Sequence, residues 1–306
     1  MEILVIAEKK ANALPFVGAL KERHAHAKYL RISKIALVSK KGETLIKSLG
    51  KELPPYDAIF IHARPSLAQF IEPLLEELTN KEIYCTAKKG SYYTALNEPF
   101  QFVTLATEGV PTPKTLTSGS AKNIEKISKK ISYPLMAKSF ISKKTQQALI
   151  VNNSKELNTF VKSIRTEIDG LMLREYIEAD AISCIVIGKK VFAVKRKNIN
   201  DTIQELSEGE TYKPTEHEEE VAIHAALACG LEIARVDLVK GRVVKIDTIL
   251  PLTQFNIICS ENIEEHVANF LIDKAALYEG KRIVPFDLIS ILKKFLSKTI
   301  FGRFFN

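Results

Sequence analysis

Alternating strand-type and helix-type segments at the start of this chain constrain its fold most strongly. Short apolar runs typical of strands alternate with longer patterns typical of amphipathic helices. The strands are Glu2–Ala7, Lys34–Ser39 and Asp57–His62, and they are followed in turn by the helices Asn12–Glu22, Glu43–Leu53 and Leu67–Asn80. Because parallel strands are usually joined by a crossover helix, this order predicts a small α/β domain with a parallel sheet over residues 1–90.

The spacing of the 13 glycines excludes three common functional turns. The two closest glycines, Gly42 and Gly50, are eight residues apart. A P-loop places glycines about five residues apart, a dinucleotide-binding turn about two or three apart, and a nucleophile elbow about four apart. None of these turns is therefore present in the sequence.

Composition indicates a folded protein with reduced cysteines. Apolar residues make up 46% of the chain and charged residues 26%, which is sufficient apolar content for a core. The four cysteines show no C-x-x-C spacing, so we expect reduced thiols rather than zinc ligands or disulfides. The first residues are typical of a strand rather than a signal peptide, and no apolar run reaches about eighteen residues. We therefore expect a cytoplasmic protein.

The positive charge is concentrated near the end of the chain. The formal net charge is +8, from 44 lysines and arginines against 36 acidic residues. Residues 281–306 contain six basic residues and one acidic residue, so this segment carries +5 of the total. The remaining +3 is too little to indicate a nucleic-acid groove, and no nucleic-acid partner is expected.

The same segment has the pattern of a basic amphipathic helix. At about 100° per residue, the apolar side chains from Phe286 onward gather on one half of the helix and the lysines on the other. Such a helix binds an anionic membrane surface or the groove of a partner, and the alternative is packing on its own domain. We predict a C-terminal tail over 281–306 with residues 286–305 as its contact region, which adds a membrane-peripheral location as an alternative.

Beyond residue 109 the chain changes to closely spaced strands. Gly109–Thr115, a link with two prolines, opens this part. Two hairpins are predicted, over Ala181–Lys197 with a turn at Gly188 and over Ala234–Asp247 with a turn at Gly241. The other predicted elements are the helices Ala121–Ile131, Ser154–Thr166 and Glu218–Gly230, the strands Tyr133–Ser139, Ala148–Val151 and Gly170–Tyr176, and a long loop over Asn198–Pro214. This order predicts α+β architecture after the N-terminal α/β domain.

Five motifs occur in the order found in one known family. They are Pro111–Pro113, Tyr133–Lys138, Leu173–Ile177, Ala234–Leu238 and Asp247–Thr253. Together they resemble the ATP-grasp superfamily over roughly residues 86–275. The similarity is to RimK-type glutamate-adding ligases in Glu175–Arg196 and to D-alanine–D-alanine ligases in Ala234–Thr253. The resemblance implies a pre-ATP-grasp domain over 1–90, a first ATP-grasp lobe over 91–172 with a flap at 139–148, and a second lobe over 173–280.

The resemblance also implies two contacts with ATP. Lys138 ends an apolar strand, where it is either a solvated strand end or, as in the family, the lysine that contacts the nucleotide phosphates. Glu175, Tyr176 and Ile177 match the family's hinge, which binds adenine through its backbone. The alternative for these three residues is an ordinary linker between domains.

Three further residues match the nucleotide site less closely. Asp180 stands one position before the acidic residue that binds ribose in the family. Lys195 and Arg196 match a basic pair of RimK-type ligases. Neighbouring residues on a strand point to opposite faces, so we expect one of the two cations to face the nucleotide and the other to be solvated.

Two aspartates on the second hairpin are the candidate metal ligands. Asp237 lies within an apolar strand, where a carboxylate is unfavourable unless it is paired or metal-bound. Asp247 returns to the same end of the hairpin, and two carboxylates suit Mg²⁺. The alternative is a pair of salt bridges with Arg235, Lys240 or Lys245. The resemblance implies that Asp237 binds Mg²⁺ and that Arg235 stabilises a tetrahedral oxyanion.

Several positions depart from the family pattern. Lys245 replaces the glutamate that bridges two Mg²⁺ ions, and Asp247 replaces a metal-binding asparagine. Glu98 stands where the family has its first ATP-binding lysine. The flap between Lys138 and Ala148 contains no glycine, although glycine lets backbone N–H groups approach phosphates closely. These changes affect both the phosphate side and the metal side of the implied site.

The sequence therefore supports two hypotheses. The first is an ATP-dependent carboxylate–amine ligase, which uses ATP and Mg²⁺ to form an acylphosphate that an amine attacks. Its substrates are small-molecule or peptide carboxylates and amines. The second is a degenerate ATP-grasp scaffold with a nucleotide-sensing or structural role, tethered to a partner or membrane by its C-terminal helix. Retention of Lys138, Arg235 and Asp237 places the ligase first, and the departures favour the scaffold.

Overall fold

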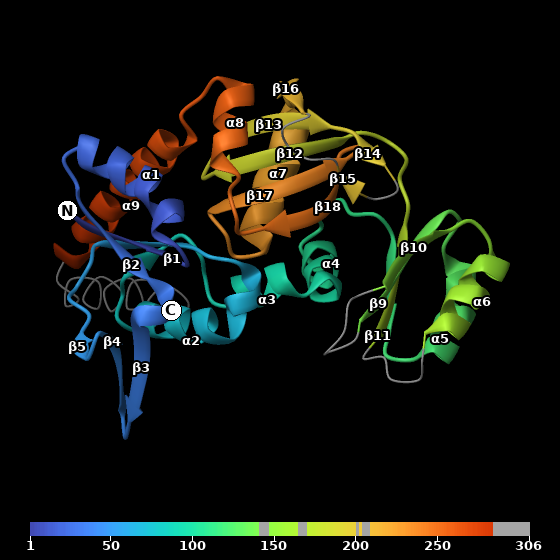
Figure 1. Cartoon of the computed structure of the whole chain (residues 1–306), viewed down its shortest axis with the longest axis horizontal. Coiled ribbons are helices and arrows are strands. Elements are labelled where there is room, and N and C mark those ends of the chain that lie inside the picture. Colours follow the sequence, from blue (N-terminus) through green and yellow to red (C-terminus); the bar gives the residue numbers. More distant parts are fainter. Residues whose placement is uncertain (141–146, 165–169, 200–201, 204–208, 284–306) are drawn as a thin grey trace, which may run out of the picture.

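The computed structural model describes residues 1–140, 147–164, 170–199, 202–203 and 209–283 of the 306-residue chain. Three sheets and the helices that cover them make up most of this part (Figure 1). The predicted tail contact region, residues 286–305, lies outside the described residues. Among the described residues, no helix combines the length and the apolar character needed to cross a bilayer.

The N-terminal part contains the predicted parallel sheet. Its strand order is β2-β1-β6-β7, with all neighbours parallel. The strands are β1 (Glu2–Ala7), β2 (His26–Arg31), β6 (Ala58–His62) and β7 (Tyr84–Cys85). Helices α1 (Lys10–Glu22) and α9 (Ile263–Ile283) cover one face, and α2 (Ala68–Asn80) covers the other. Helices on both faces explain why β1 is a nearly continuous apolar run rather than an alternating one.

An antiparallel hairpin, rather than a helix, connects β2 to β6. β3 (Ile35–Lys40) pairs with β4 (Glu43–Ser48), and the short β5 (Lys51–Glu52) extends this second sheet. The predicted strand at β3 is confirmed, but it lies outside the parallel sheet, whose edge strand β2 was not predicted. The predicted helix over Glu43–Leu53 is wrong. Gly42 and Gly50, with φ of 80° and 82°, reverse the chain at both ends of β4, so the segment between them has the length of a strand.

The middle of the chain forms a four-stranded sheet with its own core. Its order is β10-β9-β11-β8, and all of its pairs are antiparallel. The strands are β8 (Thr115–Ser118), β9 (Leu135–Phe140), β10 (Gln147–Val151) and β11 (Gly170–Glu175). Helices α5 (Ala121–Ile127) and α6 (Ser154–Ser163), with a 3₁₀ turn at Ser128–Lys130, cover one face and leave the other toward the site. The predicted strands and helices here are confirmed to within a few residues.

A five-stranded antiparallel sheet carries the second half of the site. Its order is β16-β13-β12-β17-β18, and both predicted hairpins are confirmed. The strands are β12 (Ala181–Ile187), β13 (Lys190–Arg196), β16 (Glu210–Tyr212), β17 (Ile233–Val239) and β18 (Arg242–Asp247), with α7 (Glu216–Ala228) and α8 (Leu252–Cys259) packed against them. Within the predicted long loop, the described residues include β16 and the short strands β14 (Asn198–Ile199) and β15 (Thr202–Ile203).

The parallel sheet and the five-stranded sheet share their hydrophobic cores. One cluster joins Ile6 and Leu74 with Val186, and a second joins Phe16 with Ile185 and Phe255. Helices α3 (Ser91–Leu96) and α4 (Glu98–Thr107) follow β7, and α4 lies between the five-stranded and four-stranded sheets (Figure 1). This position lets α4 contact both the four-stranded sheet and the five-stranded sheet.

Candidate functional site

Helix α4 is fixed at its N-terminus and along its length. The Asn97 side chain caps the helix by accepting a hydrogen bond from the backbone N–H of Phe100 at 3.0 Å. Glu98 therefore lies in the first turn, where the helix dipole favours a negative charge. One turn later, the buried amide of Gln101 donates to the carbonyl of Ile246 at 3.1 Å and accepts from its N–H at 3.0 Å. These two bonds cover the outer edge of β18 and attach α4 to the five-stranded sheet.

Glu98 binds the lysine that was predicted to contact phosphate. The Lys138 ammonium on β9 lies 2.9 Å and 3.0 Å from the two carboxylate oxygens of Glu98. Both side chains are largely buried, with exposed fractions of 18% and 24%. The Arg174 guanidinium on β11 approaches the same carboxylate at 3.5 Å. Glu98 thus neutralises charge on both neighbouring strands of the four-stranded sheet.

Arg174 links the two sheets across the site. Its guanidinium donates to the carbonyl of Val244 at 3.1 Å and stacks over the ring of Phe102, with 5.4 Å between the guanidinium carbon and the ring centroid. Val244 is an extra residue in β18, because Asp237 pairs with Lys245 while the next residue of β17 pairs with Val243. Such a bulge locally disrupts the ladder, and the Val244 carbonyl bonds Arg174 there.

Asp237 is enclosed by hydrogen-bond donors. Its Oδ1 accepts from the Ser183 hydroxyl at 2.5 Å and from the Arg196 guanidinium at 3.1 Å. Arg196 also donates to the Ser183 oxygen, at 2.9 Å from its Nε. Asp237 is 2% exposed and Arg196 7% exposed, so this is a buried ion pair supported by a hydroxyl. Such a pair depends on further hydrogen bonds to its polar atoms, and Ser183 supplies one to Oδ1 of Asp237.

Arg235 lies between the two predicted metal ligands. Along β17 its Nε is 3.7 Å from Asp237, and across to β18 a terminal nitrogen is 3.1 Å from Asp247. Asp247 also lies 3.6 Å from the Lys245 ammonium. The register pairs Arg235 with Asp247 and Asp237 with Lys245, so all four side chains share one face of the sheet in alternating signs. The structure therefore contains the salt bridges that were the alternative to a metal site, with Arg235 and Lys245 as the cations.

The two side chains predicted as magnesium ligands are both paired with cations in this structure. Among the described residues, no group of three or more histidine, cysteine or acidic side chains is arranged to hold a metal. Mg²⁺ requires carboxylate oxygens that are free to coordinate it. Asp237 instead uses its carboxylate to bind Ser183 and Arg196, and Lys245, a cation that cannot ligate a metal while protonated, lies opposite it in the sheet.

The hinge residues use their backbone amides within the protein. The N–H of Glu175 donates to the carbonyl of Lys114 at 2.9 Å, and the N–H of Tyr176 donates to the carbonyl of Pro134 at 3.1 Å. The Glu175 carboxylate accepts from Arg242 at 2.8 Å, which adds a second link between β11 and β18. Ile177 packs in a small apolar cluster beneath β17 and β18. The hinge is therefore a structured connection between the two sheets.

Asp180 and Lys195 lie together, apart from the buried pair. The Lys195 ammonium is 3.3 Å from Asp180 and 3.8 Å from Glu210, and all three side chains are substantially exposed. Arg196, the next residue, is turned to the opposite face and buried against Asp237. The two adjacent cations thus separate to opposite faces of β13, as the strand geometry requires.

The turn after β18 attaches the site to the parallel sheet. The hydroxyl of Thr248 donates to the carbonyl of Ala63 at 2.8 Å. The N–H of Leu250 donates to Nε2 of His62 at 3.1 Å, so His62 is neutral with its proton on Nδ1, facing the carbonyl of Asn12 at 3.4 Å. Burial lowers the pKa of His62, which favours this neutral form. The charged face of β17 and β18 is therefore held at the carboxyl end of β6.

Three contact residues were not anticipated from the sequence. Ser183 is the one hydroxyl within the apolar strand β12, and Arg174 is a charge at the end of the apolar strand β11; both patterns were visible signals. Gln101 lies in a helix without a distinguishing motif, and no local pattern indicates that it binds the edge of β18.

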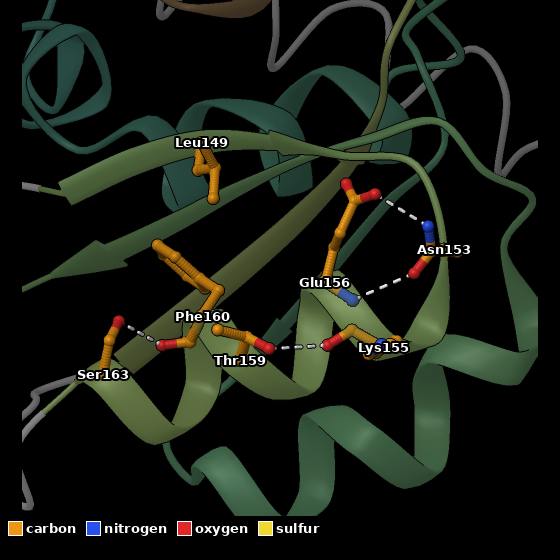
Figure 2. Close-up of a pocket in the computed structure, with 7 residues that line it drawn as sticks. All are labelled: Leu149, Asn153, Lys155, Glu156, Thr159, Phe160 and Ser163. Atoms are coloured by element: carbon orange, nitrogen blue, oxygen red, sulfur yellow. Dashed lines mark hydrogen bonds between the residues drawn. The ribbon is translucent and has the colours of Figure 1, made fainter.

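A surface cavity of about 540 Å³ lies elsewhere, between β10 and α6 (Figure 2). Its lining residues are Leu149, Asn153, Lys155, Glu156, Thr159, Phe160 and Ser163. Figure 2 shows that Asn153 and Glu156 bond each other at the start of α6, with the Glu156 N–H donating to the Asn153 side chain at 3.0 Å. The polar groups at this end of the cavity are thus used in capping the helix. None of the predicted site residues lines it.

Comparison with known proteins gives one family. A model of the RimK-like ATP-grasp domain matches residues 100–266. A probable alpha-L-glutamate ligase of Histophilus somni strain 129Pt is 22% identical over 198 residues, which cover 62% of this chain and 66% of that protein. The corresponding protein of Haemophilus influenzae is 24% identical over 199 residues, with the same coverage of both chains. The match thus spans slightly less than two thirds of these curated relatives.

Solved structures share the fold. The ATP-grasp ligase PsnB complexed with its minimal precursor has a TM-score of 0.67 and 12% identity, and the alignment covers 89% of this chain and 98% of PsnB. An ATP-grasp RimK domain protein of Sphaerobacter thermophilus has a TM-score of 0.65 and 13% identity, and the alignment covers 89% of this chain and 99% of that protein. At these identities the likeness concerns the arrangement of the chain, and the chemistry of the site rests on its own residues.

Proposed function

Since this chain belongs to the RimK-like ATP-grasp family, we propose that it keeps the fold of these ligases but acts as a binding or structural scaffold without turning over ATP. Internal ion pairs take the places that the family gives to phosphate and metal ligands. The proposal rests above all on one observation, the bidentate contact between Glu98 and Lys138. The resemblance places the family's two ATP-binding lysines at these positions.

The exchange at position 98 changes the charge on the phosphate side by two. Two lysines present two positive charges to a triphosphate, whereas the Glu98–Lys138 pair is neutral and the neighbouring Arg174 brings this group of three to +1. A phosphate would have to displace the Glu98 carboxylate from Lys138 and then lie beside its negative charge. In a largely buried setting, like charges a few ångströms apart repel by several kcal/mol at an effective dielectric constant of about 20. This repulsion supports a site that does not bind ATP.

The metal side supports the same proposal independently. Asp237 is already neutralised by Arg196, and Asp247 by Arg235 and Lys245. A divalent cation would have to compete with these fixed positive charges. Two different elements, α4 and β18, thus carry changes: Glu98 pairs with the retained Lys138 and Asp247 with the retained Arg235, while Lys245 lies beside Asp247.

The ligase hypothesis makes the opposite prediction for ATP. Binding to the native state at about 100 times the dissociation constant adds about 2.7 kcal/mol to the free energy of unfolding. For a chain of this size that corresponds to a rise of about 5 °C in melting temperature. We expect no rise for this protein with ATP, with or without Mg²⁺. A rise that requires both ligands contradicts the scaffold proposal and restores the ligase.

A charge-restoring variant tests the cause. Glu98→Lys, Lys245→Glu and Asp247→Asn together return the family's residues, and we expect this triple variant to gain a Mg²⁺-dependent shift with ATP. The control is Glu108→Lys, Lys189→Glu and Asp273→Asn, which makes the same changes of charge at exposed positions. The control should behave as the unmodified chain. If both variants gain the shift equally, net charge rather than the site explains it.

A further inference from the structure

The hairpin between β2 and β6 projects from the N-terminal part of the molecule. In Figure 1 its blue strands β3 and β4 extend below the parallel sheet. Ile35 and Ile46 are buried at its base, while Lys40, Lys41 and Glu43 at its tip are exposed. We call residues 31–53 the arm. The crossover between parallel strands is usually a helix, so an antiparallel hairpin is an uncommon way to make this connection.

One turn of the arm places a leucine in an unfavourable conformation. Leu49 and Gly50 connect β4 to β5 and have φ of 51° and 82°. Two positive φ values are those of a type I′ turn, in which Asn-Gly is the preferred pair. The left-handed region is unfavourable for a bulky residue. Leu49 is nevertheless 75% exposed, so its side chain gains little from packing in the protein.

The other non-glycine residues with positive φ in the described chain are polar. They are His24, Glu82, Lys240 and Ser260. Lys240 and Gly241 form the matching two-residue turn between β17 and β18, with φ of 48° and 69°. The same backbone geometry thus occurs twice, once with lysine and once with an exposed leucine. The backbone strain at Leu49 is not offset by packing of its side chain in the protein. It therefore indicates a contact between Leu49 and another molecule.

Lysines surround this leucine. Lys47 and Lys51 flank it along the chain, and Lys34 lies at the same end of the hairpin because the next residue, Ile35, pairs with Ser48. None of these three lysines forms an ion pair with any described residue. The arm contains six basic and two acidic residues, so it carries a net charge of +4. An exposed apolar side chain therefore lies in a basic segment whose three lysines form no ion pair with a described residue, although Glu52 is the cross-strand neighbour of Lys47.

We propose that the arm docks on an anionic membrane surface, with Leu49 entering the interface and the three lysines binding lipid headgroups. The lysines lie on both sides of the turn rather than on one face, which matches an extended layer of negative charge better than a single acidic pocket. Residues 32–53 contain no aromatic side chain that would stack on bases, which disfavours single-stranded nucleic acid. This contact does not depend on the proposed function of the site.

Sedimentation of the full chain with vesicles tests the arm. The unmodified protein should bind vesicles that contain phosphatidylserine, bind phosphatidylcholine vesicles poorly, and lose binding at high salt. Lys34→Gln, Lys47→Gln and Lys51→Gln together should weaken binding about a hundredfold. Leu49→Asn should weaken it several-fold without lowering the melting temperature, because asparagine suits the turn. The matched control, Lys240→Asn, should leave binding unchanged.

A fluorescent reporter gives a second readout. The chain has no tryptophan, so Leu49→Trp introduces a unique probe, and its emission should shift to the blue when phosphatidylserine vesicles are added. Lys240→Trp should show no such shift. Residues 286–306 also carry basic and apolar side chains, so vesicle binding alone is not decisive. If the arm variants bind as the unmodified chain does, or if Leu49→Asn lowers the melting temperature by several degrees, the proposal is wrong. Binding of acidic protein instead of lipid would equally overturn it.

Discussion

Replacing Asp237 by asparagine distinguishes a buried ion pair from a vacant metal site. The substitution removes one charge and nearly preserves shape. In this structure it removes the carboxylate that the Arg196 guanidinium, which is 7% exposed, binds together with the Ser183 hydroxyl. Removing one partner of a buried salt bridge costs about 3–5 kcal/mol, because the other charge stays desolvated and uncompensated. We therefore expect Asp237→Asn to lower the free energy of unfolding by about that amount.

Chemical and thermal unfolding measure this loss. Each kcal/mol lost from the free energy of unfolding lowers the melting temperature by about 2 °C, so the melting temperature should fall by roughly 6–10 °C. The urea midpoint should fall with an unchanged m-value, since the surface exposed on unfolding stays the same. Asp247→Asn is the matched control: Asp247 is 18% exposed against 2% for Asp237, so its loss should cost less than the loss of Asp237.

A metal ligand would behave in the opposite way. Carboxylates assembled for an absent cation repel each other, so neutralising one leaves the apo protein equally or more stable. If Asp237→Asn matches or exceeds the stability of the unmodified chain, the assignment of this carboxylate to an internal ion pair is refuted. A double variant, Arg196→Met with Asp237→Leu, should recover most of the lost stability, because removing both charges of a buried pair is nearly neutral.

Two further substitutions test how the site is attached to its neighbours. Burial lowers the pKa of His62, so as the pH falls the unfolded chain takes up a proton at this residue before the folded chain does. The free energy of unfolding should therefore be constant above about pH 6.5. Below that pH it should fall by up to about 1.4 kcal/mol per pH unit. His62→Gln should flatten that part of the urea-midpoint profile between pH 7.5 and 5.5, and an unchanged slope would contradict the assignment. Gln101→Leu should cost about 2–3 kcal/mol, since it leaves both backbone groups of Ile246 unbonded, and a loss below about 0.5 kcal/mol would show that α4 does not hold the edge of β18.

The sheets were predictable where the sequence is locally unambiguous. The apolar runs at β1 and β6 and the glycine turns at Gly188 and Gly241 define strands and hairpins with little competition from other structures. The segment Glu43–Leu53 was misassigned because its apolar residues suit a helical period almost as well as a strand. Gly42 and Gly50 reverse the chain on either side of β4, so this segment forms a strand rather than a helix.

The site was predictable as a set of positions but not as a set of partners. The motifs place Lys138, Arg235 and Asp237 on strands, and the resemblance identifies Glu98 and Lys245 as departures. The ion-pair partners depend on the packing of α4 between two sheets and on the pairing of β12 with β17. Both contacts join residues that are far apart in the sequence. No local pattern contains that information.

Calorimetric titration of the unmodified chain with ATP in excess Mg²⁺ tests the central proposal most directly. If Glu98 neutralises Lys138 and Arg196 neutralises Asp237, no saturable heat should appear up to about millimolar ATP, the level at which the binding free energy falls to about 4 kcal/mol. Saturable binding at micromolar ATP that disappears when Mg²⁺ is chelated would show that the ion pairs open to admit the nucleotide and its metal.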